Sequence, residues 1–149
     1  MKKIELSILI ALISCSIFSQ NHKYADNITF KIDKVKELSS IAVGNQSWIY
    51  PSRGNKFVVI NISIQNKADK TQNIDLDNFI LLNFKDKTKH KLEMVQTTGI
   101  VNFPAKIDLK INPKKKKKRR LIYIYPENVT PKSIMLFDEI INIYAKYLK

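Results

Sequence analysis

Few side chains in this 149-residue chain are of the types that enzymes use for nucleophilic or acid–base chemistry. A catalytic nucleophile needs a base within hydrogen-bonding reach, and the two histidines are His22, in a polar segment, and His90, in a lysine-rich hairpin. The carboxylates Asp75 and Asp77 would share one face of an extended chain, but we interpret them as polar residues bordering short strands. We therefore predict a non-enzymatic protein without catalytic residues.

The sequence does not support a metal or cofactor site either. A transition-metal site needs clustered His or Cys ligands, and the chain has two separated histidines and one cysteine, Cys15. A Ca²⁺ site needs several more oxygen ligands at fixed spacing. Three isolated glycines do not make a glycine-rich phosphate loop. We therefore expect no bound metal and no cofactor.

Positive charge is the most pronounced chemical feature of the chain. There are 26 Lys+Arg residues against 13 Asp+Glu, a net charge of +13. Seven of the cations are consecutive, and they are Lys114, Lys115, Lys116, Lys117, Lys118, Arg119 and Arg120. A second group consists of Lys85, Lys87, Lys89 and Lys91. Outside these two groups and the first 20 residues the chain is close to neutral, so the charge is local.

Two interpretations of the basic run 114–120 remain open. It can be a patch for an anionic surface such as acidic lipid headgroups, lipopolysaccharide or extracellular DNA, where each charge near a membrane contributes about 1 kcal/mol. It can also be a solvated turn that enters a buried strand, with lysine stems lying along the rim of the fold. Lys85, Lys87 and Lys89 would join the patch if their hairpin lies at the same end of the domain.

Trp48, Ile49 and Tyr50 form an apolar cluster within residues 39–55, a segment whose glycine, proline and asparagine content predicts a loop. Loops carry recognition, and Trp and Tyr favour interfaces, so these residues are a candidate contact site. The alternative, which we favour, is a loop folded over one open end of the domain.

Residues 1–20 (MKKIELSILIALISCSIFSQ) have the pattern of a secretory signal peptide. Lys2 and Lys3 precede an apolar stretch, which is shorter than the roughly 20 residues of a membrane-spanning helix. We therefore expect an exported protein, either a lipoprotein of the cell envelope or a secreted or periplasmic protein.

The mode of signal cleavage has two alternatives. Residues 12–15 resemble a bacterial lipobox, in which Cys15 becomes the acylated first residue and attaches the protein to a membrane. Ordinary cleavage near Ser19 or Gln20 would instead remove Cys15. Membrane attachment is expected only in the first case, and neither case leaves an internal disulfide.

The remaining chain reads as a short tether, 21–27, followed by one domain, 28–149. Apolar residues alternate at 28–33 and 56–66, as in half-buried strands, and residues 121–125 are apolar on both faces, as in a central strand. Further strands are predicted within 74–84, 90–95, 107–111 and 133–137. About seven or eight short strands without a βαβ rhythm predict an all-β, antiparallel, immunoglobulin-like β-sandwich. We expect a monomer.

The tail 138–149 is compatible with two structures. Apolar side chains at Ile140, Ile141, Tyr144, Tyr147 and Leu148 have the spacing of a short amphipathic helix, which we favour. The alternative is a strand.

Three features resemble a bacterial domain-of-unknown-function family of secreted proteins and lipoproteins. They are Gly54–Asn66 (GNKFVVINISIQN), the triplet Asp77-Asn78-Phe79, and a Pro113 turn followed by a basic stretch and the strand 121–126. The family is related to the immunoprotective extracellular antigen superfamily and is sometimes labelled telomeric-repeat-binding-factor-like. The sequence departs from the family pattern at Lys114, where a glycine is usual.

This resemblance, over residues 28–137, implies export, an immunoglobulin-like fold and no catalytic residues. We therefore expect an exported, non-enzymatic domain of the cell envelope that binds an unidentified protein or envelope partner or has a structural role. The alternative is an electrostatic binder of anionic polymers or membrane surfaces through residues 114–120.

Overall fold

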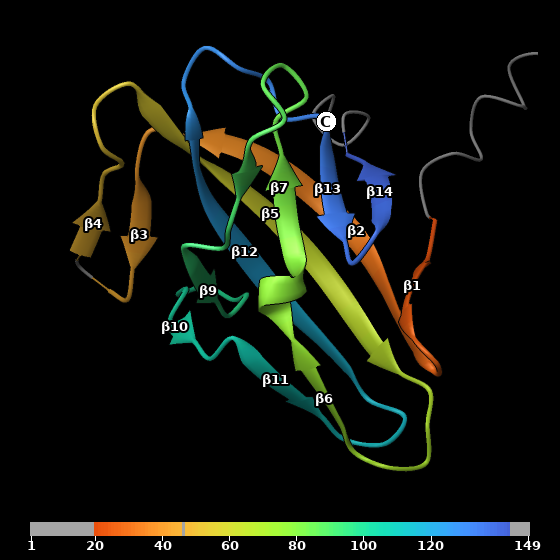
Figure 1. Ribbon diagram of the computed structural model, residues 1–149. Coiled ribbons are helices and arrows are strands. Elements are labelled where there is room, and N and C mark those ends of the chain that lie inside the picture. The colour runs from red at the N-terminus through yellow and green to blue at the C-terminus, as the bar shows by residue number, and fades with distance from the viewer. Residues whose placement is uncertain (1–19, 46, 144–149) are drawn as a thin grey trace, which may run out of the picture.

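Two layers of antiparallel strands enclose the core of the protein (Figure 1). The structure, a computed structural model, describes residues 20–45 and 47–143. The larger layer is a six-stranded sheet with the order β1-β2-β5-β12-β9-β10. In that order its strands are His22–Ala25, Ile28–Leu38, Asn55–Asn66, Lys116–Pro126, Met94–Gln96 and Pro104–Ala105.

The facing layer consists of two smaller sheets. One has the order β14-β13-β7-β8, with strands Glu139–Asn142, Ser133–Leu136, Phe79–Leu82 and Lys89–His90. The other pairs β11 (Asp108–Ile111) with β6 (Gln72–Asp75), and a 3₁₀ turn, η2 (Leu76–Asn78), joins β6 to β7. Figure 1 shows this layer in front of the long strands β2, β5 and β12. The arrangement confirms the predicted antiparallel β-sandwich.

Strand β5 supplies the centre of the core. The predicted alternation is confirmed, because Val58, Ile60, Ile62 and Ile64 all have an exposed fraction of 0%. Each such burial stabilises the fold by roughly 1.5–3 kcal/mol. The facing layer contributes Ile74, Leu76, Phe79, Leu81 and Ile134 to the same cluster.

Residues 121–125 form a central strand, as predicted, since β12 lies between β5 and β9. Tyr123 faces the main core, where its hydroxyl donates a hydrogen bond of 2.8 Å to the Phe79 carbonyl. Ile122 points to the opposite side of the sheet and packs with Phe57 and Val59 of β5. The large sheet therefore has an apolar area on its outer face that must also be covered.

A hairpin covers that outer area, where the sequence predicted a loop at 39–55. Strands β3 (Ile41–Val43) and β4 (Ser47–Ile49) pair with each other, and Ile41 packs on Phe57, Val59 and Ile122. The turn uses Gly44 at φ +63°, a conformation that glycine adopts without strain. The loop prediction was wrong because the apolar outer face of β5 and β12 gives these short strands a surface to pack on.

The predicted tether 21–27 contains strand β1, which is hydrogen-bonded to β2. The ring of Tyr24 stacks on Phe79 with centroids 5.8 Å apart, and its hydroxyl donates to the Asp75 carbonyl at 3.0 Å. This burial raises the pKa of Tyr24. The segment is polar in sequence, yet these tertiary contacts order it.

Two further predictions are corrected. Residues 139–142, expected to begin a helix, form β14 at the edge of the facing layer, with Ile141 buried and Ile140 on the exposed side. The predicted strand 90–95 is divided between β8 and β9, which belong to different layers. Residues 144–149, and Cys15 with nearly all of the predicted signal peptide, lie outside the described residues. Within the described ranges, no helix has the length and apolar character to cross a membrane.

Candidate functional site

The basic run begins in a turn. Lys114 has φ +56°, a left-handed conformation that glycine adopts without strain and that other residues adopt less readily. Its ammonium group donates to the Lys67 carbonyl at 2.6 Å and forms an ion pair with Asp69 at 2.9 Å. Lys114 therefore connects two neighbouring turns and is not part of a free basic patch.

Strand β12 divides the rest of the run between two faces. Lys117 and Arg119 lie opposite the core residues Ile64 and Ile62, so they are on the inner side of the sheet. Lys116, Lys118 and Arg120 alternate with them and are on the outer side. A stretch that is continuous in sequence is therefore two separate groups of side chains.

The outer group is joined by lysines of β2 that the sequence reasoning did not include. Across β5, Ser63 separates Lys31 from Lys118, and Asn61 separates Lys34 from Arg120. We define the cationic face as the outward side chains of β2 and β12 on these rows and their neighbours, which are Lys31, Lys34, Lys36, Lys116, Lys118 and Arg120. The lysine content of β2 was the available signal, but Lys31 and Lys34 are three residues apart and would lie on opposite faces of a regular strand. Strand pairing shows that a register shift between Ile32 and Lys34 puts them on the same side.

One carboxylate lies within the cationic face. Asp33 sits at a bulge between Ile32 and Lys34, where β2 has one residue more than β5. Its carboxylate accepts a hydrogen bond of 2.5 Å from the Ser63 hydroxyl. The face therefore has six cations and one anion, and β5 contributes the neutral polar row between the cations.

A polar pocket of about 250 Å³ lies at one border of the cationic face. It is lined by Lys36, Asn61, Thr98, Gly99, Asn102 and Arg120. Its loop wall is connected to the β3–β4 hairpin, because Gly44 N donates to the Asn102 carbonyl at 3.0 Å. Partial burial lowers the pKa of Arg120, but a guanidinium stays charged at neutral pH. The pocket therefore offers two cations and a hydroxyl to an anionic group.

Arg119 lies on the inner side of the sheet and is half-buried. Its Nη1 donates to the Lys118 carbonyl at 2.8 Å, but its Nε is buried without a hydrogen-bond partner among the described residues. Burial lowers the pKa of Arg119. A half-buried cation without a carboxylate partner does not stabilise the fold by ion pairing.

The second predicted basic group lies at the other end of the sandwich. Lys85, Lys87 and Lys89 belong to the β7–β8 hairpin, and β8 packs beside the last residues of β12, with His90 and Tyr125 rings 4.7 Å apart. The basic run enters β12 at Lys116, roughly 30 Å from Tyr125 at about 3.3 Å per residue. The structure therefore does not bring the two basic groups together.

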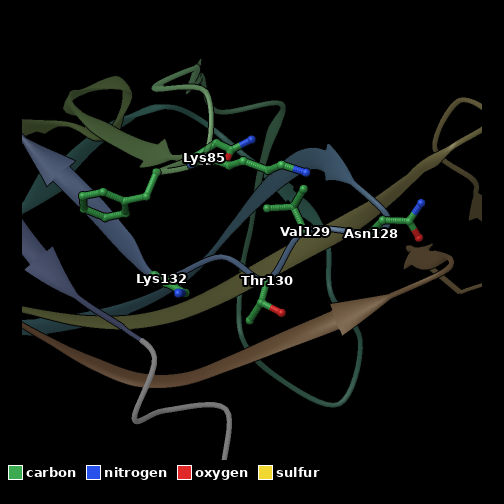
Figure 2. A pocket seen from close by; sticks show the side chains of 7 residues that line it. Lys85, Asn128, Val129, Thr130 and Lys132 are labelled. Atoms are coloured by element: carbon green, nitrogen blue, oxygen red, sulfur yellow. Dashed lines mark hydrogen bonds between the residues drawn. The ribbon is translucent and has the colours of Figure 1, made fainter.

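The β7–β8 hairpin borders a pocket of its own, of about 390 Å³ (Figure 2). It is lined by Asn83, Phe84, Lys85, Asn128, Val129, Thr130 and Lys132. Figure 2 shows Lys85 extending above Val129 toward Asn128, with Thr130 and Lys132 on the opposite side. Asp86 shapes the hairpin by accepting a hydrogen bond of 2.9 Å from Thr88 N, and this bond lowers the pKa of Asp86.

Trp48, Ile49 and Tyr50 do not fold over an open end of the sandwich, the alternative that the sequence analysis favoured. They are on and just after β4, with exposed fractions of 62%, 38% and 70%. Ile41 of the hairpin packs on the sheet beneath it, whereas the side chains of Trp48 and Tyr50 stay outside the core. They form an exposed aromatic surface on a hairpin whose turn contacts the loop wall of the polar pocket.

The sequence predicts neither catalytic residues nor a metal site. Within the described ranges, no three His, Cys, Asp or Glu side chains gather in a way that could hold a metal ion. His90, expected to be solvated, packs against Tyr125, and its Nε2 is buried without a hydrogen-bond partner in the described part of the chain.

Residues 21–146 match the family model described as "Domain of unknown function (DUF4352)". Two solved structures share the fold, each at 14% sequence identity. An uncharacterized β-sandwich protein from Clostridium difficile 630 has a TM-score of 0.59, and the match covers 83% of this chain and 88% of that one. A conserved hypothetical protein from Bacillus anthracis has a TM-score of 0.58, with coverage of 86% and 99%. No functionally curated protein matches the chain.

Proposed function

We propose that this chain, which belongs to the DUF4352 family of domains of unknown function, is an exported, non-enzymatic binding domain. Its ligand is an anionic polymer or membrane surface, and the cationic face is the binding surface. The observation that carries the proposal is the alignment of six cations from β2 and β12 on one side of the large sheet.

The cationic face has no advantage for folding. Lys31 and Lys118 are separated by one intervening strand, about 10 Å, which is close to the Debye length at physiological ionic strength. Like charges at that distance repel weakly and lower the stability of the compact state. An anionic ligand would remove this repulsion, so a binding function gives the arrangement a physical reason.

The scaffold beneath the face is suited to holding these charges in place. Strand β5 is paired along nearly its whole length with β2 on one side and β12 on the other. Its inner side chains are fully buried, so the backbone of the face cannot shift without opening the core. Because the backbone is already ordered, little conformational entropy is lost on binding, and this favours affinity.

Export is supported by two observations on the sequence. Residues 1–20 have the charge and hydropathy pattern of a secretory leader, and the family match begins at residue 21. Acylation of Cys15 would place the cationic face near a membrane, while ordinary cleavage would release the domain.

The test compares two double variants of the purified protein, both with substitutions in the basic run. Lys116→Ala/Lys118→Ala removes two charges from the cationic face, whereas Lys115→Ala/Lys117→Ala removes two charges from the same run, including the inward Lys117. Binding to phosphatidylglycerol vesicles and to double-stranded DNA is measured at low and at physiological salt.

At about 1 kcal/mol per charge, the outer variant should bind the anionic ligand roughly 30-fold more weakly. The control, with the same net charge, should lose less than about threefold, and affinity should fall steeply with salt for the unmodified protein. Equal losses in the two variants, or no loss in the outer one, would overturn the proposal.

A further inference from the structure

Four large apolar side chains are exposed on the β3–β4 hairpin and on the loop between β9 and β10, beside the cationic face. Trp48 and Tyr50 have exposed fractions of 62% and 70%, and Ile100 and Phe103, in the loop that walls the polar pocket, have 105% and 51%. We define these four residues as the aromatic ridge. Large apolar side chains exposed on connected elements of a small domain mark a candidate interaction site.

The ridge is one structural unit. Gly44 N, in the β3–β4 turn, donates to the Asn102 carbonyl at 3.0 Å, and a Cβ at Gly44 would lie 4.0 Å from the Phe103 ring. Gln96 of β9 also donates to the Ala42 carbonyl at 2.9 Å. The hairpin and the 97–103 loop are therefore connected to each other and to the large sheet.

The ridge points away from the core. Ile41, in register with Ile49, is buried against the outer face of the large sheet. Trp48 lies opposite Ala42, on the other side of the hairpin, and Tyr50 follows two residues later. Because side chains alternate along a strand, the aromatic side chains are on the outward surface of the hairpin.

The ridge stands one layer above the cationic face, since the hairpin packs on the same outer side of the sheet that carries the cations. Stacked sheets are about 10 Å apart, close to the Debye length of roughly 8–10 Å at physiological salt. If the ridge enters a surface, the cations behind it still experience the electrostatic potential of that surface.

We propose that the aromatic ridge inserts into the interface of a membrane that contains anionic lipids, while the cationic face holds the headgroups. Tyr and Trp have an apolar body and a polar tip, which suits the interface between acyl chains and water. Basic groups near the membrane add about 1 kcal/mol each. This inference rests on the proposed function and selects a lipid surface over an anionic polymer.

The sole tryptophan of the chain, Trp48, reports insertion directly. Vesicles of phosphatidylglycerol and phosphatidylcholine should shift its fluorescence to shorter wavelength, and brominated acyl chains should quench it. Neutral phosphatidylcholine vesicles and double-stranded DNA should leave the emission wavelength unchanged. Binding to the anionic vesicles without a shift or quenching would overturn the insertion.

A matched pair of phenylalanine variants tests the ridge itself. Phe103→Ser and Phe84→Ser remove side chains with exposed fractions of 51% and 52%, but Phe84 lines the pocket at the far end of the sandwich. Phe103→Ser should weaken binding to anionic vesicles at least tenfold, because burying a phenylalanine is worth roughly 1.5–3 kcal/mol. Phe84→Ser should bind as the unmodified protein does.

The two proposals fail in different ways. Retained DNA binding with no binding to anionic vesicles overturns the membrane inference and leaves the cationic face as a polymer site. Loss of binding to both ligands overturns the proposed function as well. Equal vesicle affinities of the two phenylalanine variants also overturn the inference, and the Trp48 quenching decides the matter if Phe103→Ser does not fold.

Discussion

The two halves of strand β12 have the same partner, β5, but opposite environments. Residues 121–125 are apolar and almost fully buried on both faces of the sheet, whereas residues 116–118 are lysines exposed to solvent. The difference comes from what lies around the strand. Around residues 121–125 the facing layer covers the inner side of the sheet, and the β3–β4 hairpin covers the outer side. Strand β9 pairs with residues 120–122, so among the described residues the lysines at 116–118 have a paired strand, β5, on one side only.

The comparison shows that one strand can be buried in the core at one end and present a charged, solvent-exposed surface at the other. An unpaired strand edge is a template for association with other strands, and lysines on it oppose such pairing. The charged half therefore protects the edge and, in our proposal, binds the anionic ligand. The apolar half anchors this edge to the core.

The largest effect is expected in the apolar half. Tyr123→Ala should lower the free energy of unfolding by about 3–5 kcal/mol, because it removes a fully buried aromatic side chain from the main core. Lys118→Ala should change it by less than about 0.5 kcal/mol. Urea unfolding of both variants measures the difference, and similar losses in the two would contradict the division of β12.

The next effect is a loss of stability in alkaline solution. Burial raises the pKa of Tyr123 far above its ordinary value and raises the pKa of Tyr125 to about 12. Above about pH 10 an unfolded tyrosine loses its proton while the folded one keeps it, so the unfolded state binds fewer protons and stability falls as pH rises.

The contribution of these tyrosines is complete below about pH 10. Above it, the free energy of unfolding should fall by about 1.4 kcal/mol per pH unit through Tyr123 alone, with Tyr125 acting in the same direction. Unfolding by urea at a series of pH values from 8 to 11 measures the slope. A flat profile above pH 10 would show that the Tyr123 hydroxyl reaches solvent.

A smaller effect distinguishes the two tyrosines within the apolar half. Tyr123→Phe leaves the Phe79 carbonyl without its donor in the core and should cost about 1–3 kcal/mol. Tyr125→Phe removes a buried hydroxyl that has no hydrogen-bond partner among the described residues, so it should cost close to nothing. Thermal unfolding of the pair provides the measurement, and a larger loss for Tyr125→Phe would refute the assignment.

The smallest effect is expected in the charged half. Arg119→Met replaces a half-buried guanidinium, whose Nε has no partner in the described structure, with an apolar side chain that packs in the same direction. We expect stability to be unchanged or raised by up to about 1 kcal/mol, and binding to anionic vesicles to change less than in Lys118→Ala. A destabilised Arg119→Met protein would show that this guanidinium has a structural role.

The strands that could be predicted are those whose side-chain pattern is governed by a single buried face. The alternation of β-branched residues in β5 specifies a strand, and so does the apolar run at 121–125. In both segments the side chains that face the core must be apolar. Polar or ambiguous segments could not be assigned in this way. Residues 22–25 and 139–142 form edge strands because neighbouring strands supply their hydrogen bonds, and their own composition carries little signal.

Composition and side-chain alternation were enough to specify an all-β chain whose charge is concentrated in local segments. Which of these charges share a face follows from the pairing of the strands. Register placed Lys31 of β2 and Lys118 of β12 on the same row and the same face, with β5 between them. It also separated Lys117 from its neighbours and Lys85 from the whole run. The physical reason is that alternation along a strand assigns a side chain to one of two faces. Long-range pairing determines which distant strand places its side chains on the same face. A local sequence pattern does not contain this information.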